Sequence, residues 1–193
     1  DSYNTAMGFS AGTAVTTGVE NTLIGGLAGD AINTGSYNVA LGKSSLTANT
    51  TGGSNVALGK SSMAANTTGG NNTAVGTLAV LSNTTGSNNV AVGREALEAN
   101  TTASDNTAVG YQALTANTDG HSNTAVGKVC LVANTQGLRN TALGFNAGGG
   151  VTNGDDNTMI GIFAGNHAVG TTTGIQNTLI GAQTRADAAN SGQ

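Results

Sequence analysis

A five-residue stretch of the type Asn-Thr-Ala-Val-Gly, as at 106–110, recurs along the chain and constrains its fold more than any other feature. We number each repeat from its asparagine, which is position 0. Nine successive steps are 17 residues long and the last is 20. A fixed period indicates a repeat architecture, in which each unit stacks on the next. The repeat asparagines are Asn4, Asn21, Asn38, Asn55, Asn72, Asn89, Asn106, Asn123, Asn140, Asn157 and Asn177.

The composition fits stacked repeats better than a compact globule. The 193 residues include only 3% aromatics and 8% charged residues, with neither tryptophan nor proline. Intrinsic disorder needs low hydrophobicity with high net charge, and 37% apolar residues with a net charge of −4 fit neither condition. A repeat need only bury a small apolar set against its neighbours. The mild negative charge also argues against nucleic-acid binding, and no apolar run is long enough to span a membrane.

The opening stretch of each repeat predicts a short strand. Position 1 is Thr or Val, position 3 is aliphatic or Met, and position 4 is always Gly. Side chains alternate across a strand, so positions 1 and 3 share one face and position 2, usually Ala, lies on the other. We expect the first face to fill the inside of a coil. The face with Ala and Gly would then offer a smooth surface to another chain.

The rest of the repeat predicts turns and defines two subtypes. The Ala-Leu portion after Gly admits a short helical turn, and the Thr-Thr-Gly portion predicts a turn in which position 14 glycine supplies a positive φ. Middle repeats place a larger apolar residue at position 8 and Asn at position 11, whereas outer repeats place Gly at position 8 and an apolar residue at position 11. The exchange predicts one apolar plug per coil. We therefore expect a single domain, 1–193, with outer-type repeats at 1–37 and 140–193 and middle-type repeats at 38–139.

The predicted fold is all-β: a parallel β-solenoid or β-roll of about eleven 17-residue coils, packed or intertwined as a trimer. Coils about 4.8 Å apart would make a rod roughly 50 Å long. We expect the position-0 asparagines to stack as a ladder that bonds the turn backbone. The three extra residues between His167 and Thr173 predict a bulge in one surface loop.

The stretch from Asn106 to Thr118, Asn-Thr-Ala-Val-Gly-Tyr-Gln-Ala-Leu-Thr-Ala-Asn-Thr, resembles repeats in fibre proteins of phages and bacterial surfaces. In those fibres such repeats often precede an endosialidase-type intramolecular chaperone domain. The outer copies, such as 21–25, are similar to head repeats of trimeric autotransporter adhesins, which wind as trimers. The resemblance covers essentially the whole chain. It implies a homotrimeric, extracellular fibre shaft on a virion tail or bacterial surface, taken from a longer protein, that presents a receptor-binding tip to a glycan or protein.

The sequence shows no pattern for catalysis, a metal or a cofactor. His121 and His167 lie at different repeat positions, and neither has a ligand partner at useful spacing. Asp155-Asp156 occurs once, whereas calcium-binding nonapeptide repeats need an aspartate in every turn. Cys130 is the only cysteine, and we interpret it as filling a small buried slot usually occupied by Ala or Ser. We therefore expect no enzymatic activity.

Two surface columns remain as candidates for binding. Position 5 carries Lys43, Lys60, Arg94, Tyr111 and Lys128, together with Phe9. This column either touches an anionic or sugar-coated surface or only keeps rods from associating by their edges. Position 12 is a column of threonines, whose regular spacing offers the alternative of an ice- or lattice-binding solenoid. Asn-Thr-Thr stretches at Asn49, Asn66, Asn83 and Asn100 match a glycosylation acceptor, although a repeated turn explains them equally.

Overall fold

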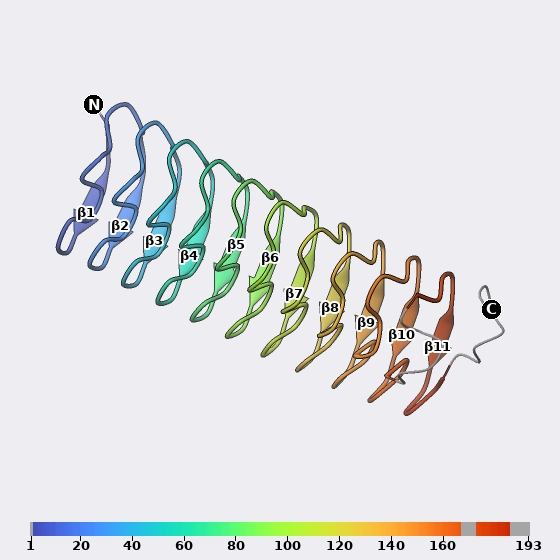
Figure 1. Cartoon of the computed structure of the whole chain (residues 1–193). Helices are drawn as coiled ribbons and strands as arrows, with labels where there is room; N and C mark the ends of the chain where they lie inside the picture. The colour runs from blue at the N-terminus through green and yellow to red at the C-terminus, as the bar shows by residue number, and fades with distance from the viewer. Residues whose placement is uncertain (1, 167–172, 186–193) are drawn as a thin grey trace.

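The chain is a parallel β-solenoid, shown by a computed structural model that describes residues 2–166 and 173–185 (Figure 1). In these ranges one strand from each coil joins a single sheet, in sequence order from β1 to β11. The described residues contain no helix long and apolar enough to cross a membrane. The strands are β1 (Thr5–Met7), β2 (Thr22–Ile24), β3 (Val39–Leu41), β4 (Val56–Leu58), β5 (Thr73–Val75), β6 (Val90–Val92), β7 (Thr107–Val109), β8 (Thr124–Val126), β9 (Thr141–Leu143), β10 (Thr158–Ile160) and β11 (Thr178–Ile180).

Successive coils stack in register, as the period predicts. In β3 and β4, Val39 pairs with Val56 and Leu41 pairs with Leu58, so equivalent positions lie above one another. Backbone hydrogen bonds continue the ladder beyond the strands; the Gly59 N–H, for example, donates to the Leu41 carbonyl at 2.8 Å. The strand residues and the glycine after them thus find backbone partners in the neighbouring coils. The coil can therefore be hydrogen-bonded although each strand has only three residues.

Within each strand, the small residue at position 2, not the larger aliphatic residue at position 3, faces the interior. In the coil that starts at Asn55, Ala57, Ser62 and Met63 are fully buried, whereas Leu58 at position 3 is only partly buried. The prediction that positions 1 and 3 fill the coil is therefore wrong. A 17-residue coil is narrow, and the position-8 side chain already occupies most of its interior. Only a methyl group fits opposite it, so Ala takes position 2 and the β-branched face turns outward.

The exchange of volume between repeat subtypes is confirmed and also involves position 2. Leu46 and Leu97, at position 8 of middle coils, are fully buried, as is Ile32, at position 11 of an outer coil. A Cβ atom added at Gly29 would lie 2.7 Å from Ile32 Cδ1 and 2.8 Å from Leu23 Cδ2. Glycine at position 8 is thus needed where Leu23 replaces the usual alanine at position 2. Close packing fixes the total volume rather than any one residue.

The predicted helical turn does not form. The segment after position 4 is instead a series of turns in which non-glycine residues adopt left-handed conformations, such as Ser44 (φ 57°) and Leu46 (φ 50°). The residue before each repeat asparagine does the same, as at Ser54 (φ 58°). This conformation is unfavourable for residues with a Cβ atom. Its recurrence in every coil shows that hydrogen bonds between coils, such as Ser61 N–H to the Lys43 carbonyl at 2.9 Å, outweigh local preference.

Glycine at position 14 has a different role from the one predicted. These glycines do not adopt a positive φ. They are needed because the next coil passes very close: a Cβ atom at Gly69 would overlap the carbonyl oxygen of Gly86 and lie 2.6 Å from Asn66 Oδ1. Ala103 is the one residue with a side chain at this position in the described coils, and it is fully buried.

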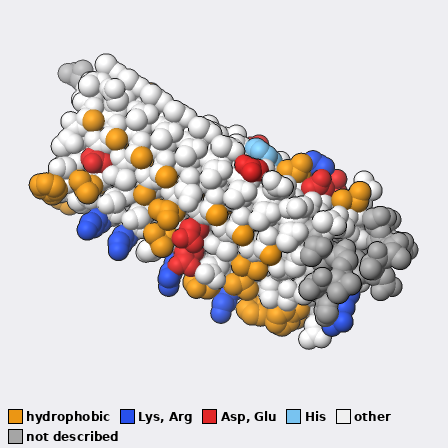
Figure 2. Space-filling view, viewed as in Figure 1, with side chains coloured by type: hydrophobic (Ala, Val, Ile, Leu, Met, Phe, Trp, Pro, Cys, Tyr) orange, Lys and Arg blue, Asp and Glu red, His pale blue; other side chains and the backbone are white. Residues whose placement is uncertain are grey.

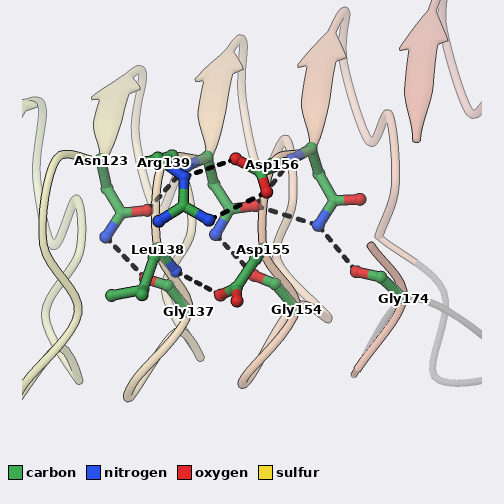
Figure 3. A network of polar contacts seen from close by, with 10 residues as sticks. Asn123, Gly137, Leu138, Arg139, Gly154, Asp155, Asp156 and Gly174 are labelled. Carbon is green, nitrogen blue, oxygen red and sulfur yellow. Dashed lines mark hydrogen bonds and ion pairs between the residues drawn. The ribbon is translucent and has the colours of Figure 1, made fainter. Parts of the chain in front are cut away.

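The predicted asparagine ladder is confirmed, and from Asn4 to Asn157 the asparagines close their own coils as well as joining neighbouring ones (Figure 3). Asn140 Nδ2 donates to the Gly154 carbonyl at 2.7 Å, fourteen residues later in the same coil. Asn140 Oδ1 accepts hydrogen bonds from the backbone N–H of Asn157 at 3.0 Å and from its Nδ2 at 2.9 Å. A second ladder runs along position 11 of the middle coils, where Asn83 Nδ2 donates to Asn66 Oδ1 at 2.7 Å. The expected bulge falls at 167–172, outside the described residues.

Candidate interaction surface

Position-5 side chains lie in one row along the rod, and we call six of them the basic–aromatic column: Lys43, Lys60, Arg94, Tyr111, Lys128 and Phe145. Phe9 occupies the same position in the first coil, and Thr77 separates Lys60 from Arg94. The position-5 residue directly follows the glycine that ends each strand, so successive coils bring these side chains into one row. All six are exposed. Sequence analysis omitted Phe145, although it occupies the same repeat position. Figure 2 shows Lys and Arg side chains next to hydrophobic ones along the lower edge of the rod.

Within this column, cations alternate with aromatic rings over four successive coils. The Arg94 guanidinium carbon and the Lys128 Nζ each lie 5.9 Å from the centre of the Tyr111 ring. Lys128 Nζ also lies 5.8 Å from the centre of the Phe145 ring. Phe145 in turn packs edge-to-face on Phe163, with ring centres 5.1 Å apart. Contacts of this type attract cations to ring faces and so limit the freedom of the long basic side chains.

One carboxylate lies beside the column, and it already has a hydrogen-bond donor and an ion-pair partner. Glu95, at position 6, accepts a hydrogen bond from Gln112 Nε2 at 2.8 Å and pairs with Arg94 at 2.5 Å. The Gln112 hydrogen bond, with a further contribution from Arg94, lowers the pKa of Glu95 below its usual value. Arg94 is thus partly neutralised, whereas Lys43, Lys60 and Lys128 have no ion-pair partner within the described ranges.

A second surface feature was missed by sequence reasoning: the outward row of position-3 side chains, which we call the outer aliphatic column. It runs along the sheet face from β1 to β11. In the body of the rod its members are half-buried or exposed, with the highest exposure, 47% and 48%, at Leu41 and Leu143. The column comprises Met7, Ile24, Leu41, Leu58, Val75, Val92, Val109, Val126, Leu143, Ile160 and Ile180.

A signal for this orientation was present in the sequence. Bulk at position 2 (Leu23, Met159) accompanies glycine at position 8 of the same repeat (Gly29, Gly165). Such compensation indicates that positions 2 and 8 compete for one space. Position 3 alternates with position 2 along the strand, so it must then lie on the other face.

The candidate metal-ligating residues serve structural hydrogen bonds. Asp155 Oδ1 accepts from the Leu138 N–H at 2.7 Å, and Asp156 pairs with Arg139 at 2.6 Å (Figure 3). His121 Nδ1 accepts from the Ser104 N–H at 2.9 Å. Among the described residues no three His, Cys, Asp or Glu side chains gather as a metal site would require. His167 lies outside the described residues.

The Asn-Thr-Thr stretches and the threonine column also use their polar atoms in hydrogen bonds within the solenoid. Asn49, a potential glycan acceptor, is fully buried and its Nδ2 donates to the Gly52 carbonyl at 2.9 Å. An enzyme could not reach this nitrogen in the folded chain. In the threonine column, Thr50 and Thr67 are half-buried, and each hydroxyl donates to a carbonyl of the next coil, at 3.1 and 2.9 Å. These hydroxyls are therefore not a free array of donors for a crystal lattice.

Cys130 fills a fully buried slot at position 7, as expected. Its Sγ lies 3.4 Å from the Ala147 carbonyl oxygen. Burial raises the pKa of the thiol to about 12. A thiol that does not ionise near neutral pH is a poor nucleophile, so this side chain serves packing.

Comparison of the chain with protein-family models, with curated proteins and with solved structures gives no match.

Proposed function

We propose that this chain forms the shaft of a homotrimeric extracellular fibre, on a phage tail or a bacterial surface, that holds a receptor-binding tip away from the particle or cell. The observation that supports this proposal most directly is the outer aliphatic column. Contiguous apolar surface of this extent is rare on monomers and marks sites of association. The column is continuous along the rod, which suits a partner of equal length.

A second copy of the chain is the partner that matches this surface best. Another solenoid has the same spacing between coils, so aliphatic side chains could interdigitate rung by rung over the whole length. Position 1, with Thr or Val on the same face, widens the strip without adding charge. The association predicted through the Ala and Gly face cannot occur because that face lies inside the coil. The trimer is therefore proposed through the opposite face of the strand.

The stacked coils suit a mechanical role. Hydrogen bonds join each coil to the next along the rod, and the ladders at positions 0 and 11 add side-chain bonds to the backbone ones. Such a body resists bending and offers few exposed backbone segments to proteases. The shaft would contribute to attachment by its stiffness and reach.

The solution mass of the purified chain tests the proposal. We expect light scattering to give about three times the 18.7 kDa of one chain. Replacing Val92 and Val109 together by Lys should reduce the mass to that of a monomer while the circular dichroism spectrum keeps its β-type shape. The control replaces Thr68 and Thr85 by Lys, because both are exposed at position 13, away from the sheet. A wild-type monomer, or equal effects of the two double variants, would contradict the trimer.

A further inference from the structure

The distribution of basic residues is unusual for a chain with so few charges. The protein has 6 Lys and Arg residues and a net charge of −4, yet four of these basic residues occupy position 5. Of the other two, Arg139 is tied to Asp156. None of the acidic residues of the described coils lies at position 5; Glu95, at position 6, is next to it, and the others are Glu20, Asp30, Glu98, Asp105, Asp119, Asp155 and Asp156. The basic–aromatic column is therefore a positive row on a negative protein.

Aromatic neighbours order this row at its C-terminal end. Tyr111 lies between Arg94 and Lys128, and each contacts the ring at 5.9 Å. Because the two cations come from the preceding and the following coil, the ring faces are directed along the rod. They are occupied by cations and are not free to stack on a ligand. The rings thus hold Arg94 and Lys128 in place and reduce the entropy that Lys128 loses on binding.

These features fit a linear polyanion that lies parallel to the rod. The cationic groups form a single file. Lys43 and Lys60 belong to adjacent coils about 4.8 Å apart, comparable to the length of one sugar unit, and Lys128 lies four coils beyond Lys60, roughly 19 Å along the rod. A membrane surface would contact a patch rather than one row of charges. A nucleic acid duplex carries one phosphate charge per about 1.7 Å, so the rest of this acidic protein would repel it more strongly than a polysaccharide with one carboxylate per sugar.

We propose that the basic–aromatic column binds an acidic polysaccharide whose carboxylates accept hydrogen bonds from Lys43, Lys60 and Lys128. Arg94, which already pairs with Glu95, and Tyr111 and Phe145 act as positioning residues. The inference goes beyond the shaft role, because it assigns a ligand class to the side of the rod. It does not depend on the trimer, since the row lies beside the outer aliphatic column and not within it.

Isothermal titration of the full chain with alginate oligomers, linear chains of uronic acids, tests the proposal, with dextran as the uncharged polymer. We expect binding to alginate and not to dextran, with an affinity that decreases as salt rises. The variant K43Q/K60Q/K128Q should bind alginate about tenfold or more weakly, since three exposed charge pairs are lost. The variant K43R/K60R/K128R should retain binding.

A charge-matched control separates the site from overall repulsion. The variant T51E/T68E/T85E changes the net charge by the same amount, three units from −4, at exposed residues of position 13. Its affinity for alginate should stay within about threefold of wild type at moderate salt, because salt screens the repulsion between the added carboxylates and the polymer. Equal losses in the Gln and Glu variants would overturn the proposal.

Three further outcomes would also overturn the proposal. One is undiminished binding by the Gln variant, and another is equal affinity for anionic phospholipid vesicles or DNA. The third is a change in the solution mass of the Gln variant, which would make the row part of the interface between chains. Failure of the trimer alone, with alginate binding intact, would leave this inference standing.

Discussion

Asn134 is the last member of the position-11 ladder because the residue one coil further on is Val151. Asn134 Nδ2 donates to Asn117 Oδ1 at 3.0 Å and to the Gly137 carbonyl at 3.2 Å, but its Oδ1 is buried without a hydrogen-bond partner in the described structure. Where the repeat changes subtype, the ladder therefore ends on an unsatisfied acceptor. Such a group carries a desolvation penalty that the rest of the ladder avoids.

Because the ladder ends in this way, we predict that asparagines of the same column contribute different amounts to the free energy of unfolding. Asn83, inside the ladder, donates to Asn66 Oδ1 and the Gly86 carbonyl and accepts from Asn100 Nδ2 at 2.9 Å. Asn83→Ala removes all three bonds, whereas Asn134→Ala removes only two and also deletes the unpaired oxygen. We expect Asn83→Ala to lower the free energy of unfolding by about 1 kcal/mol more than Asn134→Ala. Urea unfolding of both variants measures the difference, and equal losses would contradict it.

Because neighbouring coils pass close to each other at position 14, we predict that adding a methyl group there destabilises the chain, whereas removing the one at Ala103 does not. Gly69→Ala would force a methyl group against the Gly86 carbonyl and should cost about 1–3 kcal/mol. At Ala103 the methyl group is already present, and the Thr101 N–H to Thr118 carbonyl distance is 3.3 Å, against 2.8 Å for the equivalent Thr84–Thr101 bond.

The reverse change, Ala103→Gly, relieves this crowding but adds freedom to the unfolded chain, which costs about 0.4–1 kcal/mol. We expect the Ala103→Gly variant to stay within about 1 kcal/mol of wild type. Thermal unfolding compares the two variants. If Gly69→Ala were tolerated as well as Ala103→Gly, the steric explanation would be wrong.

The buried thiol predicts both low reactivity and a dependence of stability on high pH. A disulfide reagent at pH 8 should not label Cys130 in the folded chain but should label it fully in denaturant. Folding raises the pKa of the thiol from 9.0 to about 12, so its contribution to stability is complete below pH 9 and decreases as the pH rises towards 12. In that window the loss is about 1.4 kcal/mol per pH unit.

Cys130→Ala is the matched control for the thiol, because alanine is the usual residue at position 7. Lysines and tyrosines also titrate at high pH, but they do so equally in both proteins. The difference between wild type and the variant therefore isolates the thiol. Rapid labelling of the folded wild type, or identical stability curves above pH 9, would contradict this account.

The fold was predictable from the sequence because one period governs it. The in-register stacking, the Asn140 ladder and the buried plugs Leu46 and Ile32 all follow from residues that recur every 17 positions. Which face of the strand lies inside the coil was predicted wrongly, because Ala57 and Leu58 are both apolar and hydrophobicity alone does not distinguish them. The width of the coil determines which side chain fits inside, and that width depends on the turns.

The turns could not be predicted because their conformations contradict local preference. Ser44 and Leu46 adopt left-handed conformations that favour glycine, and nothing in either side chain indicates this. Only stacking of identical turns makes such a backbone favourable. The basic–aromatic column, in contrast, followed directly from the shared position of Lys43 and Lys128. Its order, with cations on both sides of Tyr111, required the three-dimensional structure.

The in-register sheet also determines how the rod would respond to being pulled from its two ends. Hydrogen bonds between coils are parallel to the long axis, so pulling on the chain ends separates coils one at a time rather than shearing all the interfaces together. The outermost coil, with a neighbour on one side only, detaches first and exposes the next. Each event would release 17 residues, roughly 60 Å of extended chain. A tether of this kind lengthens in steps and dissipates a sudden load without losing its anchor.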